Sequence, residues 1–229
     1  MTKYLLISGG TKGLGAAISK RFSQEYLVTA LYRTDEQAAK MLQQRDKIRC
    51  VRHDITLAPY AMPPMNSEDE LVVIHNAAAR FIPTPMHLSD LNQYRAQWDV
   101  AIGGAHNLIY PCLRQLVNVS RGTVIAVLTS AVVGLPPKGF APYTSAKQAL
   151  KGFIESVSVE FGGRGVRSFS VSPGFMDTEM TQAWDERMRH SVGAGNILTT
   201  EHAADRIYQL AHEDSTKAAG ENYLLVGQI

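Results

Sequence analysis

A tyrosine and a lysine four residues apart are the first candidates for chemistry in this sequence. Tyr143 precedes Lys147, and on a helix this spacing places both side chains on one face. A nearby ammonium stabilises a phenolate, so Tyr143 would exchange protons near neutral pH although an ordinary phenol titrates near 10. Ser130, upstream at the end of an apolar run, offers a hydroxyl to hold a carbonyl or alcohol oxygen. These groups supply the proton half of a carbonyl–alcohol interconversion.

The hydride half of that reaction requires a cofactor, because no side chain supplies a hydride. A glycine cluster near the N-terminus predicts where it binds: Gly9, Gly13 and Gly15 lie between a short apolar run and a helical pattern. A glycine turn lets backbone N–H groups approach a pyrophosphate, with the positive end of the helix behind them. The spacing is Gly-x-x-x-Gly-x-Gly, whereas other dinucleotide folds carry Gly-x-Gly-x-x-Gly.

The elements that must position these residues follow from the alternation of apolar runs and helical patterns. The predicted strands are 4–8, 26–32, 48–51, 71–74, 122–128, 166–171 and 223–226, and the predicted helices are 13–23, 90–119 with an interruption at Gly103-Gly104, 143–161 and 200–212. This order predicts an α/β fold, a doubly wound parallel sheet in a single domain covering 1–229, with ligands at the carboxyl ends of the strands. Prolines 59, 63 and 64 predict an irregular crossover over 56–70.

Composition narrows the possible partners. The chain has 229 residues, 45% of them hydrophobic, and a formal charge of +2. This suits one packed domain and makes nucleic acid and membranes poor partners. The apolar run before Gly9 is too short for a secretory segment, so we expect a cytoplasmic protein. Cys50 and Cys112 lack metal-ligand spacing, so we expect free thiols and no metal.

Ser130, Tyr143, Lys147 and the glycine spacing together resemble the short-chain dehydrogenase/reductase family, over nearly the whole chain. The resemblance implies a Rossmann fold and an NAD(P)-dependent oxidoreductase acting on CH–OH and C=O groups. Ser130 would position the carbonyl, Tyr143 would donate the proton, and Lys147 would lower the Tyr143 pKa and bind the nicotinamide ribose. The fifth strand is one residue longer than usual, so Thr129 is an alternative to Ser130; we prefer Ser130 for its distance from Tyr143.

The resemblance also implies a substrate and an assembly. The expected substrate is a small-molecule ketone of the 3-oxoacyl or secondary-metabolite type. The expected assembly is a homodimer or homotetramer packed through the two long helices.

A further set of residues is assigned to the cofactor by the same resemblance: the glycine loop, the ends of four strands and the catalytic pair. They are Gly9, Thr11, Lys12, Gly13, Leu14, Gly15, Arg33, Thr34, Asp54, Ile55, Asn76, Ala77, Tyr143, Lys147, Pro173, Gly174, Met176 and Thr178. Asp54 would meet the adenine amino group, and Asn76 would connect neighbouring strands. Thr178 would hold the carboxamide and cap the next helix.

The choice between the two nicotinamide cofactors depends on the residues after the second strand. Tyr32 ends this strand and Arg33 and Thr34 follow, so no acidic residue there binds ribose hydroxyls or opposes a 2′-phosphate. Lys12 and Arg33 would clamp that phosphate from two sides. The sequence therefore predicts NADPH (NADP+), with NADH less favoured. Asp35 is expected to begin the next helix.

Two departures from the family pattern keep alternatives open. His75 stands where the first Asn of Asn-Asn-Ala-Gly is usual, and Ala101 stands where an Asn usually holds a water that connects the lysine to solvent. Asn107 is too far around the helix to replace it. The alternatives are an NAD-dependent alcohol dehydrogenase and a catalytically weak member that acts as a binding or assembly subunit.

A lid over the substrate is expected at 176–198. Met180, Trp184 and Met188 recur at four-residue spacing there, which is typical of an apolar helical face. Together with Leu135, Phe140 and Met176, this face predicts a largely apolar substrate pocket.

Overall fold

The computed structural model describes residues 1–45, 47–193, 197–213 and 220–227. Its parallel strands form one sheet in the order β3-β2-β1-β4-β5-β6-β7. The strands are β1 (Lys3–Ser8), β2 (Leu27–Tyr32), β3 (Ile48–Arg52), β4 (Glu70–His75), β5 (Arg121–Val127), β6 (Val166–Pro173) and β7 (Asn222–Leu225). The chain reverses its direction of winding between β1 and β4, where ligands bind in folds of this kind. The predicted doubly wound parallel sheet is confirmed.

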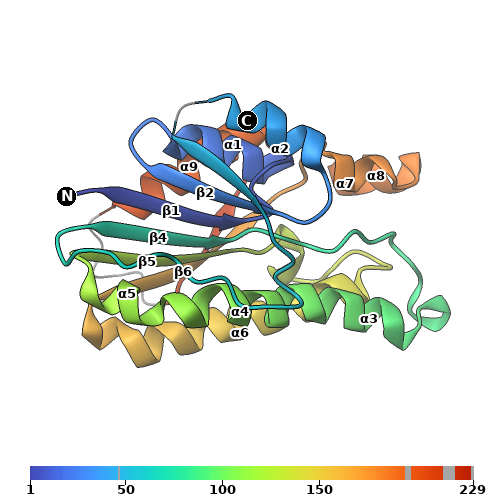
Figure 1. The fold of residues 1–229 in the computed structure, drawn as a ribbon. Helices are drawn as coiled ribbons and strands as arrows, with labels where there is room; N and C mark the ends of the chain where they lie inside the picture. The colour runs from blue at the N-terminus through green and yellow to red at the C-terminus, as the bar shows by residue number, and fades with distance from the viewer. Residues whose placement is uncertain (46, 194–196, 214–219, 228–229) are drawn as a thin grey trace.

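Helices cover both faces of the sheet (Figure 1). One face carries α1 (Gly13–Phe22), α2 (Glu36–Gln43) and α9 (Thr200–His212), and the other carries α3 (Leu91–Trp98), α4 (Gly104–Ile109), α5 (Leu113–Asn118) and α6 (Ala141–Phe161). Two short helices, α7 (Glu179–Gln182) and α8 (Glu186–Gly193), project where the strands end. Helices α7 and α8 thus lie beside the carboxyl edge of the sheet.

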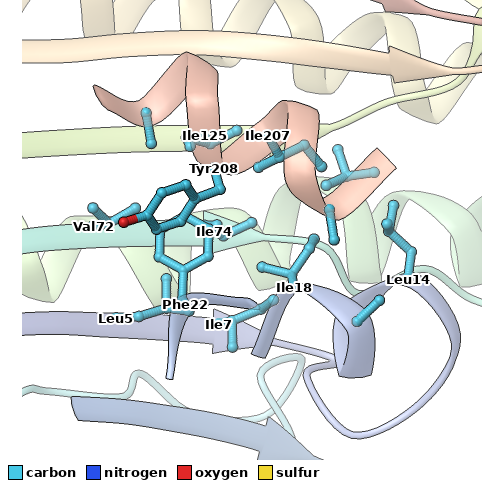
Figure 2. Close-up of a cluster of buried hydrophobic side chains, with 14 of the residues drawn as sticks. Leu5, Ile7, Leu14, Ile18, Phe22, Val72, Ile74, Ile125, Ile207 and Tyr208 are labelled. Atoms are coloured by element: carbon cyan, nitrogen blue, oxygen red, sulfur yellow. The ribbon is translucent and has the colours of Figure 1, made fainter. Parts of the chain in front are cut away.

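The strands are apolar because helices bury both faces of the sheet. Every residue of β4, the central strand, is buried. Figure 2 shows the core on the α1 and α9 face, where Leu5, Ile7, Val72 and Ile74 of the sheet meet Phe22 and Tyr208 of the helices. This packing fixes where the central strands end, and the functional groups follow those ends.

The helix predicted over 90–119 is interrupted as expected, with a five-residue π-helical turn between α3 and α4, η2 (Asp99–Gly103). A 3-10 turn, η3 (Tyr110–Cys112), separates α4 from α5 and contains Pro111, which cannot donate a helical hydrogen bond. Residues 53–69 contain neither helix nor strand, as the prolines predicted.

Neither a membrane span nor a metal site is found in the described part of the chain. None of its helices is long and apolar enough to cross a bilayer. No three of its His, Cys, Asp or Glu side chains gather as metal ligands. Cys50 and Cys112 are free thiols, as expected.

Candidate active site

A cleft of about 1050 Å³ opens at the carboxyl ends of the strands. Every catalytic and cofactor residue predicted from the sequence lines it, although these residues come from segments spread over most of the chain. The three catalytic candidates line it together with the glycine loop and the loops after β2, β3, β4 and β6. The cleft is therefore one continuous site and not several separate surfaces.

The glycine loop between β1 and α1 is shaped for close approach of a ligand to backbone. Gly9 and Gly13 have φ values of +61° and +50°, which other residues rarely adopt. A Cβ on Gly15 would lie 2.0 Å from the carbonyl oxygen of Gly9, so a side chain is excluded there. Asn76 donates from Nδ2 to the same carbonyl at 3.0 Å and connects β4 to β1, as predicted. A backbone cradle at a helix N-terminus fits the pyrophosphate of a dinucleotide.

Tyr143 and Lys147 lie in the first turns of α6, which begins at Ala141 with Pro142 next. Both are buried, with 8% and 3% of their surface exposed. The Lys147 ammonium donates to the carbonyl of Val127 at 2.7 Å and lies 5.9 Å from the centre of the Tyr143 ring. The helical spacing thus brings the lysine head beside the phenol ring, but directs it at a strand carbonyl.

The acidity of this pair differs from the expectation. Burial lowers the pKa of Lys147 to about 8 and raises the pKa of Tyr143 to about 12, since both charged forms are costly away from water. The predicted depression of the Tyr143 pKa is therefore not found in this structure. The reason is that burial dominates the pKa of Tyr143, while the Lys147 ammonium donates to the Val127 carbonyl and not to the phenol.

The hydroxyl that meets Tyr143 is that of Thr129, the alternative to Ser130. A hydrogen bond with the Thr129 side chain lowers the pKa of Tyr143, though by less than burial raises it. Thr129 follows the end of β5 and accepts a bond from the backbone N–H of Ala131 at 3.3 Å. Ser130 begins the 3-10 turn η4 (Ser130–Val132) and lines the cleft beside it. The role of Ser130 as the substrate-positioning hydroxyl stays a prediction.

Lys12 lines the cleft and lies between two carboxylates. Its Nζ is 3.1 Å from Asp35 Oδ2 and 2.5 Å from Glu179 Oε2, and Glu179 also pairs with Arg80. Asp35 caps α2 by accepting from Ala38 N at 2.9 Å, which confirms that it begins this helix. However, the same carboxylate reaches the lysine, so the expectation that no acidic residue opposes a 2′-phosphate is wrong for Asp35. The Lys12–Glu179 pair was not predicted from the sequence, because these two residues lie far apart along the chain.

His75 and Ala101, the two departures from the family pattern, are both buried. His75 Nδ1 lies 3.0 Å from Ser8 Oγ. Burial, with a further contribution from the Lys147 charge, lowers the pKa of His75 to about 3, so its imidazole is neutral at physiological pH. Ala101 lies in the π-helical turn η2. Asn107 donates to the carbonyl of Ile55 at 2.7 Å, which confirms that it does not replace the missing amide.

Two predicted cofactor residues are held by their own loops. Asp54 accepts hydrogen bonds from the backbone N–H and the hydroxyl of Thr56, at 2.9 and 2.7 Å. Thr178 is the N-cap residue of α7, as expected, and its backbone N–H donates to Thr181 Oγ1 at 3.0 Å. Both residues line the cleft.

Aromatic residues enclose the Tyr143 end of the cleft. Phe140, Tyr143 and Trp184 form a buried cluster, against which Phe81, Phe175, Met188 and Val192 pack. The prediction of a largely apolar pocket included Phe140, Trp184 and Met188, whereas Leu135 lines the cleft but is 96% exposed. Phe81 and Phe175 were not predicted from the sequence, because their only signal is an aromatic residue shortly after a strand. The predicted lid over 176–198 includes residues 194–196, which lie outside the described residues.

The chain is similar to proteins of known type over nearly its full length. A family model described as short chain dehydrogenase matches residues 3–189. A 3-oxoacyl-[acyl-carrier-protein] reductase of Chlamydia muridarum is 24% identical, over 96% of this chain and 94% of its own. An acetoacetyl-CoA reductase of Paracoccus denitrificans is 28% identical, over 82% and 79%.

Solved structures share the fold at lower identity. A 3-ketoacyl-(acyl-carrier-protein) reductase of Brucella melitensis complexed with NADH superimposes with a TM-score of 0.83 at 16% identity, covering 98% of this chain and 97% of its own. A short chain dehydrogenase of Burkholderia cenocepacia in complex with NADP gives a TM-score of 0.81 at 17% identity, covering 98% and 96%.

Proposed function

This chain belongs to the short-chain dehydrogenase family of NAD(P)-dependent oxidoreductases, which act on CH–OH and C=O groups, and we propose that it reduces a ketone with NADPH. The observation that carries the proposal is the convergence of Tyr143, Lys147 and two hydroxyl residues with the glycine loop in one cleft.

Each catalytic residue has a separate role in the proposed reduction. The hydroxyl of Thr129 or Ser130 holds the carbonyl oxygen against Tyr143, and Tyr143 donates its proton to that oxygen. A bound nicotinamide supplies the hydride. The raised pKa of Tyr143 supports this direction, because the phenol stays protonated and able to donate at neutral pH. In this proposal the Lys147 ammonium holds the nicotinamide ribose and stabilises the phenolate left behind, and its position 5.9 Å from the centre of the Tyr143 ring supports the second role.

Cofactor choice is the next part of the proposal. Lys12 and Arg33 line the cleft beside the end of β2 and support NADPH, since guanidinium and ammonium groups bind a 2′-phosphate. Asp35 supports the alternative, an NAD-dependent enzyme, because its carboxylate already occupies one side of Lys12. Dissociation constants for NADPH and NADH decide between them. The NADPH proposal expects NADPH to bind more tightly and Lys12→Ala/Arg33→Ala to remove the difference.

The substrate class follows the relatives in outline. The 3-oxoacyl reductase and acetoacetyl-CoA reductase names support a ketone of the 3-oxoacyl or secondary-metabolite type. The apolar enclosure around Tyr143 supports a substrate whose carbonyl carries apolar groups. We also propose that residues 176–198 act as the lid, because Trp184 from this segment packs in one cluster with Phe140 and Tyr143.

Oxidation of NADPH with a panel of ketones tests the proposed reaction, with Tyr143→Phe as the control. The proposal expects turnover in the wild type and a loss of at least about 100-fold in the variant, which lacks the proton donor. If NADPH binds but no ketone is consumed, the result favours the alternative, a catalytically weak family member that acts as a binding or assembly subunit. His75 and Ala101 are the residues that support that alternative.

We propose that the protein self-associates through exposed apolar residues of α3 and α6. Trp98 at the end of α3 is 40% exposed and Val159 near the end of α6 is 85% exposed. Such residues suit a homodimer or homotetramer packed through these helices. Light scattering on the purified protein measures the assembly directly.

A further inference from the structure

Four aromatic residues from four separate segments meet beside Tyr143, and we call them the aromatic wall. Phe81 follows β4, Phe140 precedes α6, Phe175 follows β6, and Trp184 lies between α7 and α8. All four line the cleft. We infer that this wall makes the enzyme selective for ketones that carry a flat ring next to the carbonyl, an inference that rests on the proposed ketone reduction.

The rings pack in an ordered way around the proton donor. Phe81 lies parallel to Tyr143, with 4.4 Å between ring centres and 10° between planes. Phe81, Phe140 and Trp184 form a triangle of edge contacts with centre distances of 5.1, 5.2 and 5.3 Å. Phe175 extends the triangle beside Trp184 at 6.2 Å. One face of the phenol is therefore covered by an aromatic ring.

Two hydrogen bonds to backbone carbonyls hold the wall in place. The Trp184 indole N–H donates to the carbonyl of Phe81 at 3.1 Å, which joins the lid segment to the loop after β4. The N–H of Thr84 donates to the carbonyl of Gly139 at 3.0 Å, which joins that loop to the one carrying Phe140. A wall fixed at two points limits the shapes that fit against it.

The chemistry of the wall favours a flat apolar group. None of its members is charged, and the one polar atom among the side chains, the indole nitrogen of Trp184, is already bonded to Phe81. Phe140 and Trp184 are buried, whereas Phe81 and Phe175 are half-buried and line the cleft. Aromatic pairs stabilise one another beyond simple burial of area. A ring held against the aromatic wall loses little conformational freedom, whereas an open alkyl chain loses more.

Two ketones with the same number of carbons test the inference, acetophenone with its ring and 2-octanone with an open chain. Acetoacetyl-N-acetylcysteamine serves as the 3-oxoacyl probe. We expect kcat/KM for acetophenone to exceed that for 2-octanone and for the thioester by at least about tenfold. Phe81→Leu keeps the apolar volume but removes the ring, and it should reduce this ratio at least about fivefold, mainly through KM. Phe161→Leu, at the end of α6 and outside the cleft lining, is the matched control and should leave the ratio unchanged.

A binding measurement tests the role of the aromatic wall independently of catalysis. The chain has two tryptophans, so Trp98→Phe leaves Trp184 as the only source of indole fluorescence. We expect acetophenone to quench this emission saturably, and Phe81→Leu to weaken the binding at least about fivefold. Failure to turn over any ketone, with saturable quenching intact, would overturn the proposed function but support the wall. Equal or better use of 2-octanone or the thioester, or a ratio that Phe81→Leu leaves unchanged, would overturn the inference.

Discussion

The ammonium group of Lys12 lies 3.1 Å from a carboxylate oxygen of Asp35, although the two residues belong to different βα turns. Lys12 precedes α1, and Asp35 precedes α2. The hydrogen bond from Lys12, together with the stronger one from the Ala38 backbone, holds the pKa of Asp35 below its usual value. The same lysine thus serves two purposes, since it neutralises an acid of this chain and is proposed to bind a phosphate of the cofactor.

Replacing Asp35 by Asn should therefore strengthen NADPH binding. Asn still caps α2, so the helix is retained while the carboxylate that competes for Lys12 is lost. We expect the NADPH dissociation constant to fall about threefold to tenfold, with little change for NADH, because exposed charge pairs have modest energies. Isothermal titration calorimetry measures both constants. Asp177→Asn is the control, since Asp177 pairs with Arg189 and does not line the cleft; an equal gain in that variant would contradict the prediction.

The hydroxyl beside Tyr143 can be identified by paired substitutions. Thr129→Val keeps the shape of the side chain and removes its hydroxyl, and we expect kcat to fall about 100-fold, the usual cost of losing a positioned donor. Ser130→Ala should cost less than about tenfold, and Thr129→Ser should stay close to the wild type. Steady-state kinetics with one ketone measures all three. A larger loss in Ser130→Ala than in Thr129→Val would return the role to Ser130.

Gly15→Ala should damage the glycine loop. The added Cβ would lie 2.0 Å from the Gly9 carbonyl oxygen, so the loop must shift away from its cradle shape. We expect a loss of about 2 kcal/mol or more in unfolding free energy. NADPH binding should weaken by more than about tenfold. Urea denaturation and calorimetry measure the two effects.

Gly152→Ala is the control for Gly15→Ala, and we expect it to change stability in the opposite direction. Gly152 lies within α6, and a Cβ there would meet nothing within 4 Å. Alanine is the better helix former, so stability should rise by up to about 1 kcal/mol. Loss of stability in both variants would show that the loop is not specially constrained.

The buried His75 should make the fold sensitive to acid. Its pKa is lowered to about 3 in the folded protein, so between this value and the ordinary 6.5 the unfolded chain binds a proton that the folded chain does not. The stability that this group contributes is complete above about pH 6.5 and is lost as the pH falls toward 3. Between about pH 7 and about pH 4.5, the wild type should lose about 2–3 kcal/mol more stability than His75→Asn.

Urea unfolding at the two pH values measures this difference. His87→Asn is the control, because His87 is exposed and should leave the acid loss of the wild type unchanged. Identical pH dependence in the wild type and His75→Asn would show that His75 is accessible to protons in the folded state.

Much of the fold could be predicted from the sequence because the local strand and helix patterns agree with the sheet and helices that they form. Apolar runs bounded by glycine or polar residues predicted the strands, and Gly103-Gly104 predicted an interruption in the helix over 90–119. The strands of a parallel sheet all end at the same edge, so residues at the strand ends are expected to lie close together there. This is why every predicted site residue lines the same cleft.

The tertiary structure alone decided which groups touch within that cleft. The contact of Lys12 with Glu179 joins residues 167 positions apart, and the contact of Phe81 with Tyr143 joins the loop after β4 to the first turn of α6, which no periodicity links. The choice between Thr129 and Ser130 depends on where β5 ends, and the pKa of Tyr143 depends on how deeply it is buried. Spacing along the chain predicts which face a side chain shares, whereas burial and long-range contact arise only when separate elements pack together.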